Sequence, residues 1–246
     1  MKIAIVTGSS GGIGSIICQT LLDNGWAVVG LDKHELTDLE SKNFTIMKCD
    51  LKDSKNIEKT VHKIKTKYNQ ISLLVNCAAV QRVNKIIHYT PHDWDETLQV
   101  NAKAPLLLAS LLQPLLYANS QHESWSNIVN ISSIHAKVTS EGMVAYAASK
   151  AALTSITRSL SIEFSKYNIR VNSITPGAVA TPMLFEHLTK NQIDALLNKQ
   201  LIRELISPES IANLIVYLTS DHATNITGQD FVIDSGVLPQ LLTETK

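Results

Sequence analysis

The sequence predicts a three-layer α/β fold, with a doubly wound parallel sheet of seven strands and helices on both of its faces. Short apolar runs rich in Val and Ile alternate with amphipathic helical patterns, which is typical of parallel strands joined by right-handed crossovers. A glycine-rich turn lies between the first run and the first helical pattern, as in folds that bind nucleotides. The expected strands span residues 2–7, 26–32, 44–49, 71–76, 127–132, 168–174 and 229–233.

The first helix is expected directly after the glycine-rich turn, and it ends at Asn24-Gly25, a common helix stop. Trp26 then opens the second strand. Core-facing helical spacing is kept by Ile13, Ile16, Ile17 and Leu21.

A second helix start is Thr90-Pro91, an N-cap followed by proline at the first helical position. The helical pattern continues to about Ala118, and Pro105 and Pro114 are expected to bend the helix or end it early. Its leucines cover more than one helical stripe, which indicates either a deep core helix or a helix that packs partly on a second subunit. They are Leu106, Leu107, Leu108, Leu111, Leu112, Leu115 and Leu116.

The 246 residues suit one domain, residues 1–246, which includes a candidate substrate loop at about residues 183–205. Lys and Arg total 22 against 22 Asp and Glu, so no affinity for nucleic acid or a membrane surface is expected. No run reaches the ~18 apolar residues of a membrane span. The three cysteines lack metal-type spacing and leave an odd thiol. With no secretory signal recognised, we expect a cytoplasmic protein without a metal, acting on a small molecule.

Gly8, Gly12 and Gly14 lie on the turn into the first helix, where missing side chains let backbone N–H groups approach a pyrophosphate. Their spacing is G-x-x-x-G-x-G rather than G-x-G-x-x-G, but the context of strand, turn and helix is the one that dinucleotide binding requires. Asp32 ends the second strand 18 residues after Gly14. A carboxylate there accepts hydrogen bonds from both adenosine ribose hydroxyls and repels a 2′-phosphate, while Lys33 is the cation beside it. NAD is therefore favoured over NADP.

Tyr146 and Lys150 are four residues apart in a helical stretch and therefore share one face. An ammonium beside a phenol is expected to lower the pKa of the phenol, which makes tyrosine a usable proton donor and acceptor. Ser133 follows an expected strand, at the edge of the sheet where ligands bind, and its hydroxyl can hold a substrate oxygen.

Together these residues resemble the short-chain dehydrogenase/reductase family, in the branch with a single Rossmann domain, over nearly the whole chain. The matching motifs are Thr7-Gly8-x-x-x-Gly12-Ile13-Gly14, Asp50-Leu51, Asn101, Ser133, Tyr146 with Lys150, and Pro176-Gly177 through Thr181.

The resemblance implies that Tyr146 exchanges a proton while hydride passes between the nicotinamide and the carbinol carbon. It also implies that Lys150 binds the nicotinamide ribose, that Asn101 steadies a water in the proton relay, and that Thr181 supports the nicotinamide carboxamide. The coenzyme-binding residues it implies are Gly8, Ser10, Gly12, Ile13, Gly14, Asp32, Asp50, Leu51, Asn76, Ala78, Tyr146, Lys150, Pro176, Gly177, Val179 and Thr181.

Two segments depart from the family pattern. The Asn-Asn-Ala-Gly of the family is here Asn76-Cys77-Ala78-Ala79, so Ala79 adds a methyl group near the coenzyme ribose. The late Asp-Gly-Gly is here Asp234-Ser235-Gly236, and this change is expected to affect only the C-terminal turn.

Family resemblance places the substrate pocket among the residues after Ala79, those after Ser133, and the stretch from Met183 to about Leu205. The three candidate substrate residues are Gln81, His135 and Met183. Gln81 and His135 resemble the acid-binding positions of 3-hydroxybutyrate dehydrogenases, but the expected lysine three residues before the tyrosine is Met143. A surface or structural role stays open for each polar candidate in these segments. The candidates are Gln81, His135, Arg82, Glu141, His187 and Arg203.

The sequence thus predicts an NAD-dependent alcohol dehydrogenase or ketoreductase acting on a small polar secondary alcohol, such as a sugar, polyol or cyclic alcohol. A 3-hydroxy acid dehydrogenase or 3-oxoacyl reductase of the same family is an alternative. An alternative of another class is a dinucleotide-binding regulator without turnover. The resemblance implies a homotetramer, and a dimer stays open.

Overall fold

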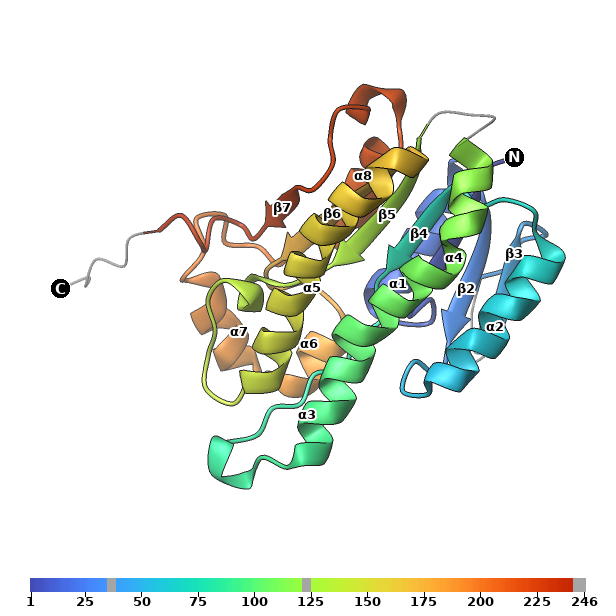
Figure 1. Ribbon diagram of the computed structural model, residues 1–246. Helices are drawn as coiled ribbons and strands as arrows, with labels where there is room; N and C mark the ends of the chain where they lie inside the picture. Colours follow the sequence, from blue (N-terminus) through green and yellow to red (C-terminus); the bar gives the residue numbers. More distant parts are fainter. Residues whose placement is uncertain (35–38, 121–124, 241–246) are drawn as a thin grey trace.

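The computed structural model describes residues 1–34, 39–120 and 125–240 (Figure 1). Within these residues, seven strands form one parallel sheet in the order β3-β2-β1-β4-β5-β6-β7. The strands are β1 (Ile3–Thr7), β2 (Ala27–Asp32), β3 (Phe44–Lys48), β4 (Leu73–Asn76), β5 (Ser126–Ile131), β6 (Ile169–Pro176) and β7 (Asp230–Ile233). The predicted fold class is confirmed, and each expected strand is found within two residues of its predicted bounds.

The strand order reverses between β1 and β4. From β1 the chain moves outward to β2 and β3, then returns to place β4 on the other side of β1. In open parallel sheets this reversal leaves a crevice at the carboxyl ends of the central strands, and ligands bind there. The turn after β1 and the loop after β4 therefore face each other across the crevice.

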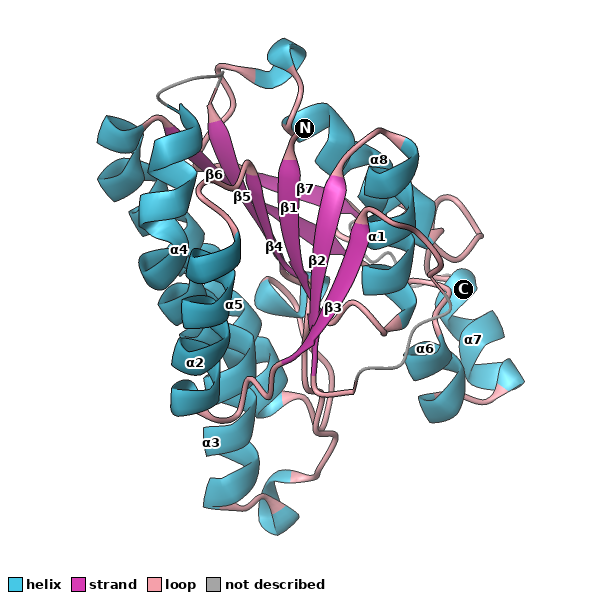
Figure 2. Ribbon diagram, turned by 90° about the vertical axis from the view of Figure 1, so that its right-hand side faces the viewer, coloured by secondary structure: helices cyan, strands magenta, loops and turns pink. Residues whose placement is uncertain are grey.

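Helices cover both faces of the sheet (Figure 2). One layer contains α2, α4 and α5, and the other contains α1 packed against α8. The helices are α1 (Gly12–Asp23), α2 (Ser54–Lys67), α3 (Pro91–Leu98), α4 (Ala104–Ser120), α5 (Val144–Phe164), α6 (Pro182–His187), α7 (Lys190–Leu197) and α8 (Pro208–Leu218). Among the described residues, no helix combines the length and apolar character that crossing a membrane requires.

Strand β1 shows how the sheet divides the core. Ile5 packs in the cluster beneath α2, α4 and α5, while Ala4 and Val6 pack in the cluster beneath α1 and α8. Successive side chains of a strand point to opposite faces, so a strand between two helical layers is apolar on both sides. This two-sided burial explains why the strands appear in the sequence as continuous apolar runs.

The helical segment that starts at Thr90-Pro91 does not end at either proline. Helix α3 passes into a π-helical turn, Gln99–Lys103, and α4 then runs through Pro114 to Ser120. Within the turn, the Ala104 N–H donates to the carbonyl of Gln99, five residues back. Pro105 has no N–H to donate, so the carbonyl four residues before it lacks its usual partner, and the wider turn accommodates this loss.

The leucines of α4 pack mainly in the core. Leu108, Leu112 and Leu116 are completely buried, whereas Leu106 is 42% exposed. The deep-core interpretation therefore holds for most of this helix. The exposed remainder of the helix includes Leu106 and Tyr117, and the expectation of a second subunit depends on that part.

Candidate active site

The turn between β1 and α1 can form only with glycine at two of its positions. Gly8 has a φ of 70°, and a Cβ on it would lie 2.8 Å from the Cα of Ala78. A Cβ on Gly14 would lie 2.0 Å from the carbonyl oxygen of Gly8. The start of α1 therefore packs directly on the turn. The N-cap residue of α1, Gly11, has no side chain that could accept from the first amides of the helix. The first amides of α1 are left to interact with an anion.

Asp32 lies at the carboxyl end of β2, beside this turn. Its two carboxylate oxygens accept hydrogen bonds from the backbone N–H groups of Ser10, at 3.1 Å, and His34, at 3.2 Å. These bonds fix the carboxylate at the edge of the crevice. Each oxygen has further lone pairs with which it can accept a hydroxyl.

The loop after β3 contains the residues expected at the adenine. The Asp50 carboxylate accepts from the N–H of Lys52 at 3.0 Å, and Leu51 is buried. The amide of Gln99 donates to the Leu51 carbonyl at 3.1 Å. The loop is therefore anchored both within itself and to the π-helical turn.

The loop after β4 is held by Thr7, at the end of β1. The Thr7 hydroxyl oxygen accepts from the N–H groups of Cys77, at 3.0 Å, and Ala78, at 3.1 Å. Asn76 donates to the side chain of Asn130 at 2.8 Å, but its own side-chain oxygen is buried and has no partner among the described residues. A buried acceptor without a donor costs free energy, so a ligand that donates to it there would be stabilised.

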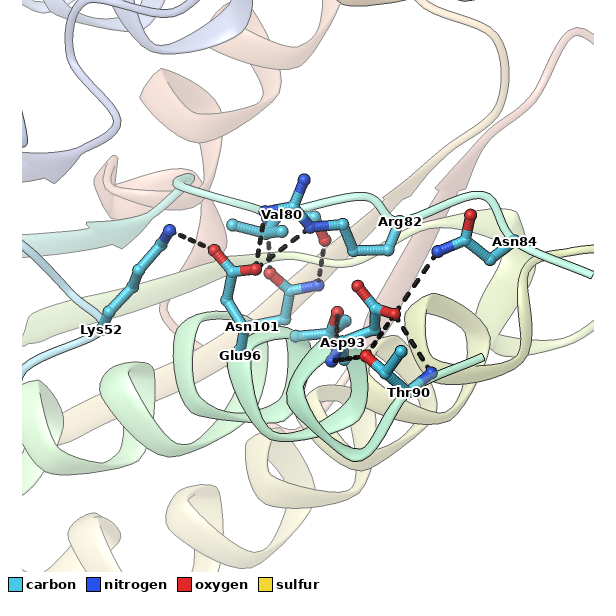
Figure 3. A network of polar contacts seen from close by, with 9 residues as sticks. Lys52, Val80, Arg82, Asn84, Thr90, Asp93, Glu96 and Asn101 are labelled. Atoms are coloured by element: carbon cyan, nitrogen blue, oxygen red, sulfur yellow. Dashed lines mark hydrogen bonds and ion pairs between the residues drawn. The ribbon is translucent and has the colours of Figure 1, made fainter. Parts of the chain in front are cut away.

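Asn101, in the π-helical turn, connects the loop after β4 to α5. Its side chain accepts from the N–H of Val80 at 2.8 Å and donates to the Val80 carbonyl at 2.9 Å (Figure 3). It also donates to the Ser149 hydroxyl at 3.0 Å. All three bonds are made within the protein. The side chain of Asn101 therefore holds the loop after β4 against α5.

The structure brings Ser133, Tyr146 and Lys150 together at the carboxyl end of β5. The Ser133 hydroxyl shares a hydrogen bond with Tyr146. The Lys150 ammonium lies 5.7 Å from the centroid of the Tyr146 ring, and it donates to the carbonyl of Ile131 at 2.7 Å. Lys150 is 2% exposed and Ser133 is 7% exposed, so this group is enclosed.

The expected depression of the tyrosine pKa is not found. Burial raises the pKa of Tyr146 to about 12, although the hydrogen bond from Ser133 acts in the opposite direction. Burial lowers the pKa of Lys150 to about 8, with the nearby Cys77 acting against that shift. The prediction was wrong because spacing places the ammonium beside the phenol but does not reveal how strongly the site is desolvated.

The segment after β6 closes the site on the side of α1. Pro176 ends β6, and the Gly177 N–H donates to the carbonyl of Ile233 at 2.8 Å. Val179 and Thr181 are buried, and a Cβ on Gly12 would lie 3.0 Å from the Cβ of Thr181. Glycine at position 12 therefore allows this segment to approach the start of α1, where Ile13 packs partly buried.

Two of the three substrate candidates lie near the catalytic group. The His135 ring stands edge-on to that of Tyr146, with centroids 5.8 Å apart, and burial lowers the pKa of His135. Gln81 contacts the sulfur of Met143 at 3.5 Å. The third, Met183 on α6, is 45% exposed.

The remaining polar candidates are placed differently. Arg82 pairs with Glu96, which sequence reasoning does not identify. Glu141 is 81% exposed and lies 4.0 Å from Lys85, and Arg203 is exposed. The side chain of His187 lies outside the part that the structure describes.

Two comparisons with known sequences place the chain among reductases and dehydrogenases. A family described as "Enoyl-(Acyl carrier protein) reductase" matches residues 8–238. The chain is 32% identical over 241 residues to an NAD-dependent glycerol dehydrogenase of Listeria innocua, covering 96% of this chain and 93% of that protein. It is 30% identical over 245 residues to a 3-oxoacyl-(acyl-carrier-protein) reductase of Thermotoga maritima, covering 96% and 98%.

A solved structure of 4-hydroxyisoleucine dehydrogenase complexed with NADH superposes with a TM-score of 0.90 at 29% identity. The match covers 98% of this chain and 100% of that one. The similarity therefore extends over the whole sheet and both helical layers.

Proposed function

The chain belongs to the short-chain dehydrogenase/reductase family of oxidoreductases, and we propose that it transfers hydride between NAD and a small polar secondary alcohol or the corresponding ketone. The observation that carries this proposal is the enclosed group of Ser133, Tyr146 and Lys150 at the same edge of the sheet as the glycine turn. Neither part alone indicates the reaction. Together they supply a proton donor and a dinucleotide site.

The residues present fit a dinucleotide. The turn of Gly8 to Gly14 leaves backbone amides for a pyrophosphate, and the side-chain oxygen of Asn76 is a buried acceptor without a protein donor. Asp32 is fixed where it can accept ribose hydroxyls, and a carboxylate there disfavours a 2′-phosphate. These contacts, with the NAD dependence of the glycerol dehydrogenase relative, support NAD over NADP. When bound, the coenzyme supplies the acceptor or donor of hydride.

Tyr146 exchanges the proton with the substrate oxygen, and Ser133 holds that oxygen. Because the pKa of Tyr146 is raised to about 12, the phenolate needs stabilisation before it can accept a proton near neutral pH. The chain supplies two sources of it, the hydrogen bond from Ser133 and the positive charge of Lys150. Asn101 holds the loop after β4 with its side chain and offers its carbonyl to a water.

A sugar, polyol or cyclic alcohol is the substrate class that we favour. His135 stands beside Tyr146, and burial lowers its pKa, which favours the neutral ring. A neutral imidazole can both donate to and accept from a hydroxyl. Met143 occupies the position at which a hydroxy-acid substrate would meet a lysine, and it contacts Gln81. A 3-hydroxy acid dehydrogenase or a 3-oxoacyl reductase is the second candidate, favoured by the similarity to the Thermotoga maritima reductase.

We also propose a homotetramer in the cytoplasm. Leu106 and Tyr117 on α4 and Ile162 on α5 are exposed, and association with another copy would cover apolar side chains of this kind. All three cysteines are free thiols, which fits a reducing compartment. Light scattering distinguishes a tetramer from a dimer.

The proposal is tested by initial rates with NAD and with NADP across sugars, polyols, cyclic alcohols and 3-hydroxy acids. We expect turnover with NAD on one polar class, and Tyr146→Phe should abolish it while NADH binding is retained. Activity of this variant above a few per cent of wild type would refute the role of Tyr146. Bound NADH without turnover on any of these compounds would instead favour a dinucleotide-binding regulator.

A further inference from the structure

Glu96, on α3, carries a carboxylate that is almost completely buried between two cations. Its side chain is 2% exposed, whereas those of Lys52 and Arg82, which pair with it from either side, are 46% and 44% exposed (Figure 3). Arg82 donates to one carboxylate oxygen through Nη2, at 2.6 Å, and through Nε, at 3.1 Å. Lys52 contacts the other oxygen. Burying a carboxylate is costly unless it is paired in this way.

The two cations come from two different loops, one after β3 and one after β4. Lys52 follows Asp50-Leu51 directly, and its N–H donates to the Asp50 carboxylate at 3.0 Å. Arg82 follows Gln81, in the loop after β4 that contributes to the proposed substrate pocket. One carboxylate therefore fixes the adenine-side loop against the substrate-side loop.

The substrate-side loop is also fixed to the helix that carries the catalytic tyrosine. Asn101 holds Val80 through both of its backbone groups and donates to the Ser149 hydroxyl. That hydroxyl donates to the carbonyl of Tyr146 at 2.7 Å. Polar contacts thus run without a break from Asn101 through Ser149 to the backbone of Tyr146.

We propose that Glu96 is a positioning residue that couples coenzyme binding to the arrangement of the substrate-side loop, by holding Lys52 and Arg82 to one carboxylate. The inference deepens the proposed function and rests on it, because it assumes that the adenine lies beside Asp50-Leu51. Glu96 contacts neither reactant in this arrangement. Its effect on them passes through the two loops.

A crossed effect tests the coupling. We expect Arg82→Met, a change on the substrate side, to weaken NADH binding. We expect Lys52→Met, a change on the adenine side, to raise KM for the alcohol. Each effect should be about 5- to 20-fold, at the lower end of the usual range of coupling between sites. In the Glu96→Gln background the same two changes should alter NADH affinity and KM by less than about twofold further, because Glu96 no longer joins the two cations. NADH binding is followed by fluorescence titration.

The matched control is Asp95→Asn, which removes the same charge from the same helix at an exposed position. It should leave NADH affinity and KM unchanged. A merely structural role for Glu96 predicts a different result, in which Glu96→Gln lowers the melting temperature but leaves NADH affinity and KM unchanged well below it. That result, or purely additive effects of the Lys52 and Arg82 changes, would overturn the proposal.

If Glu96→Gln does not fold, the test uses changes at Lys52 and Arg82 alone, because both side chains are exposed and their replacement is compatible with folding. The double variant Lys52→Met/Arg82→Met then replaces it, and its effects should be no larger than those of either single change. The NADH titration needs no turnover, so failure of the proposed reaction is distinguished from failure of the coupling.

Discussion

The substitution Gly14→Ala isolates the contact on which the glycine turn depends. The new Cβ would lie 2.0 Å from the carbonyl oxygen of Gly8, which is backbone and cannot rotate away. That oxygen also accepts from the N–H of Gly11 at 3.0 Å, so relieving the overlap disturbs the bond that closes the turn. The turn must open by more than an ångström.

The free-energy cost of Gly14→Ala has two contributions. Overpacking of a rigid site costs about 1–3 kcal/mol, and loss of the turn hydrogen bond adds about 1 kcal/mol. If the opened turn no longer matches a pyrophosphate, most of this free energy appears in binding, and Kd for NADH rises by roughly 10- to 100-fold. The part that appears in folding lowers Tm by about 2 to 4 °C per kcal/mol for a chain of this size.

Gly11→Ala is the matched control in the same turn. Its Cβ would lie 3.2 Å from the same carbonyl oxygen, and Gly11 has a φ of −83°, which any residue adopts. We expect NADH affinity within about threefold of wild type, since small strain of this kind costs roughly 0.5 kcal/mol. Fluorescence titration and differential scanning calorimetry of the two variants measure both effects. Equal Kd values for the two variants would refute the steric reasoning.

Three further predictions concern side chains around the site. Asp32→Asn should lower kcat/KM with NAD by about tenfold and narrow the preference for NAD over NADP, because a charge-assisted hydrogen bond to the ribose is lost; steady-state rates with both coenzymes show whether the ratio changes. His135→Ala should raise KM for the polar substrate much more than KM for the coenzyme, and equal changes would contradict a place at the pocket wall. Asp230→Asn should destabilise the fold at pH 7 by about 1–3 kcal/mol, because the ion pair with Lys137 is lost. Burial raises the pKa of Asp230, but Lys137 and two strand hydroxyls outweigh it and hold that pKa below its usual range. The stabilisation is therefore complete above the unfolded pKa, about 4, and is lost as pH falls through the lower folded pKa. Urea unfolding at pH 7 and near pH 3 measures it. The difference in free energy of unfolding between wild type and variant should be smaller at the lower pH.

The parts of the molecule that local sequence specifies were predicted well. Strands β1 to β7 lie where apolar runs occur, because a strand between two helical layers needs apolar residues on both faces. The turn around Gly8 and Gly14 was also predictable, since few residues other than glycine fit such a backbone. The spacing of Tyr146 and Lys150 gave their relative position correctly.

Properties that depend on distant segments were not predictable in the same way. The pKa of Tyr146 follows burial, which several loops create together. Arg82 was considered for the substrate pocket, but a carboxylate 14 residues later in the chain pairs with it. The sequence does not single out Glu96, because an acidic residue on an amphipathic helix usually faces solvent. Its burial becomes evident only when α3 and both loops are assembled.

In the π-helical turn, the side-chain amide and the backbone carbonyl of Asn101 have separate roles. The side-chain amide contacts Val80 and Ser149, so it holds the loop after β4 to α5. The backbone carbonyl lacks the N–H donor that an α-helix would supply four residues later, because that position is Pro105. Pro105 acts by lacking a hydrogen atom. An alanine at that position would return the missing donor and draw the carbonyl back into an ordinary helical turn. The water site that we propose at Asn101 therefore depends on the proline as well as on the asparagine.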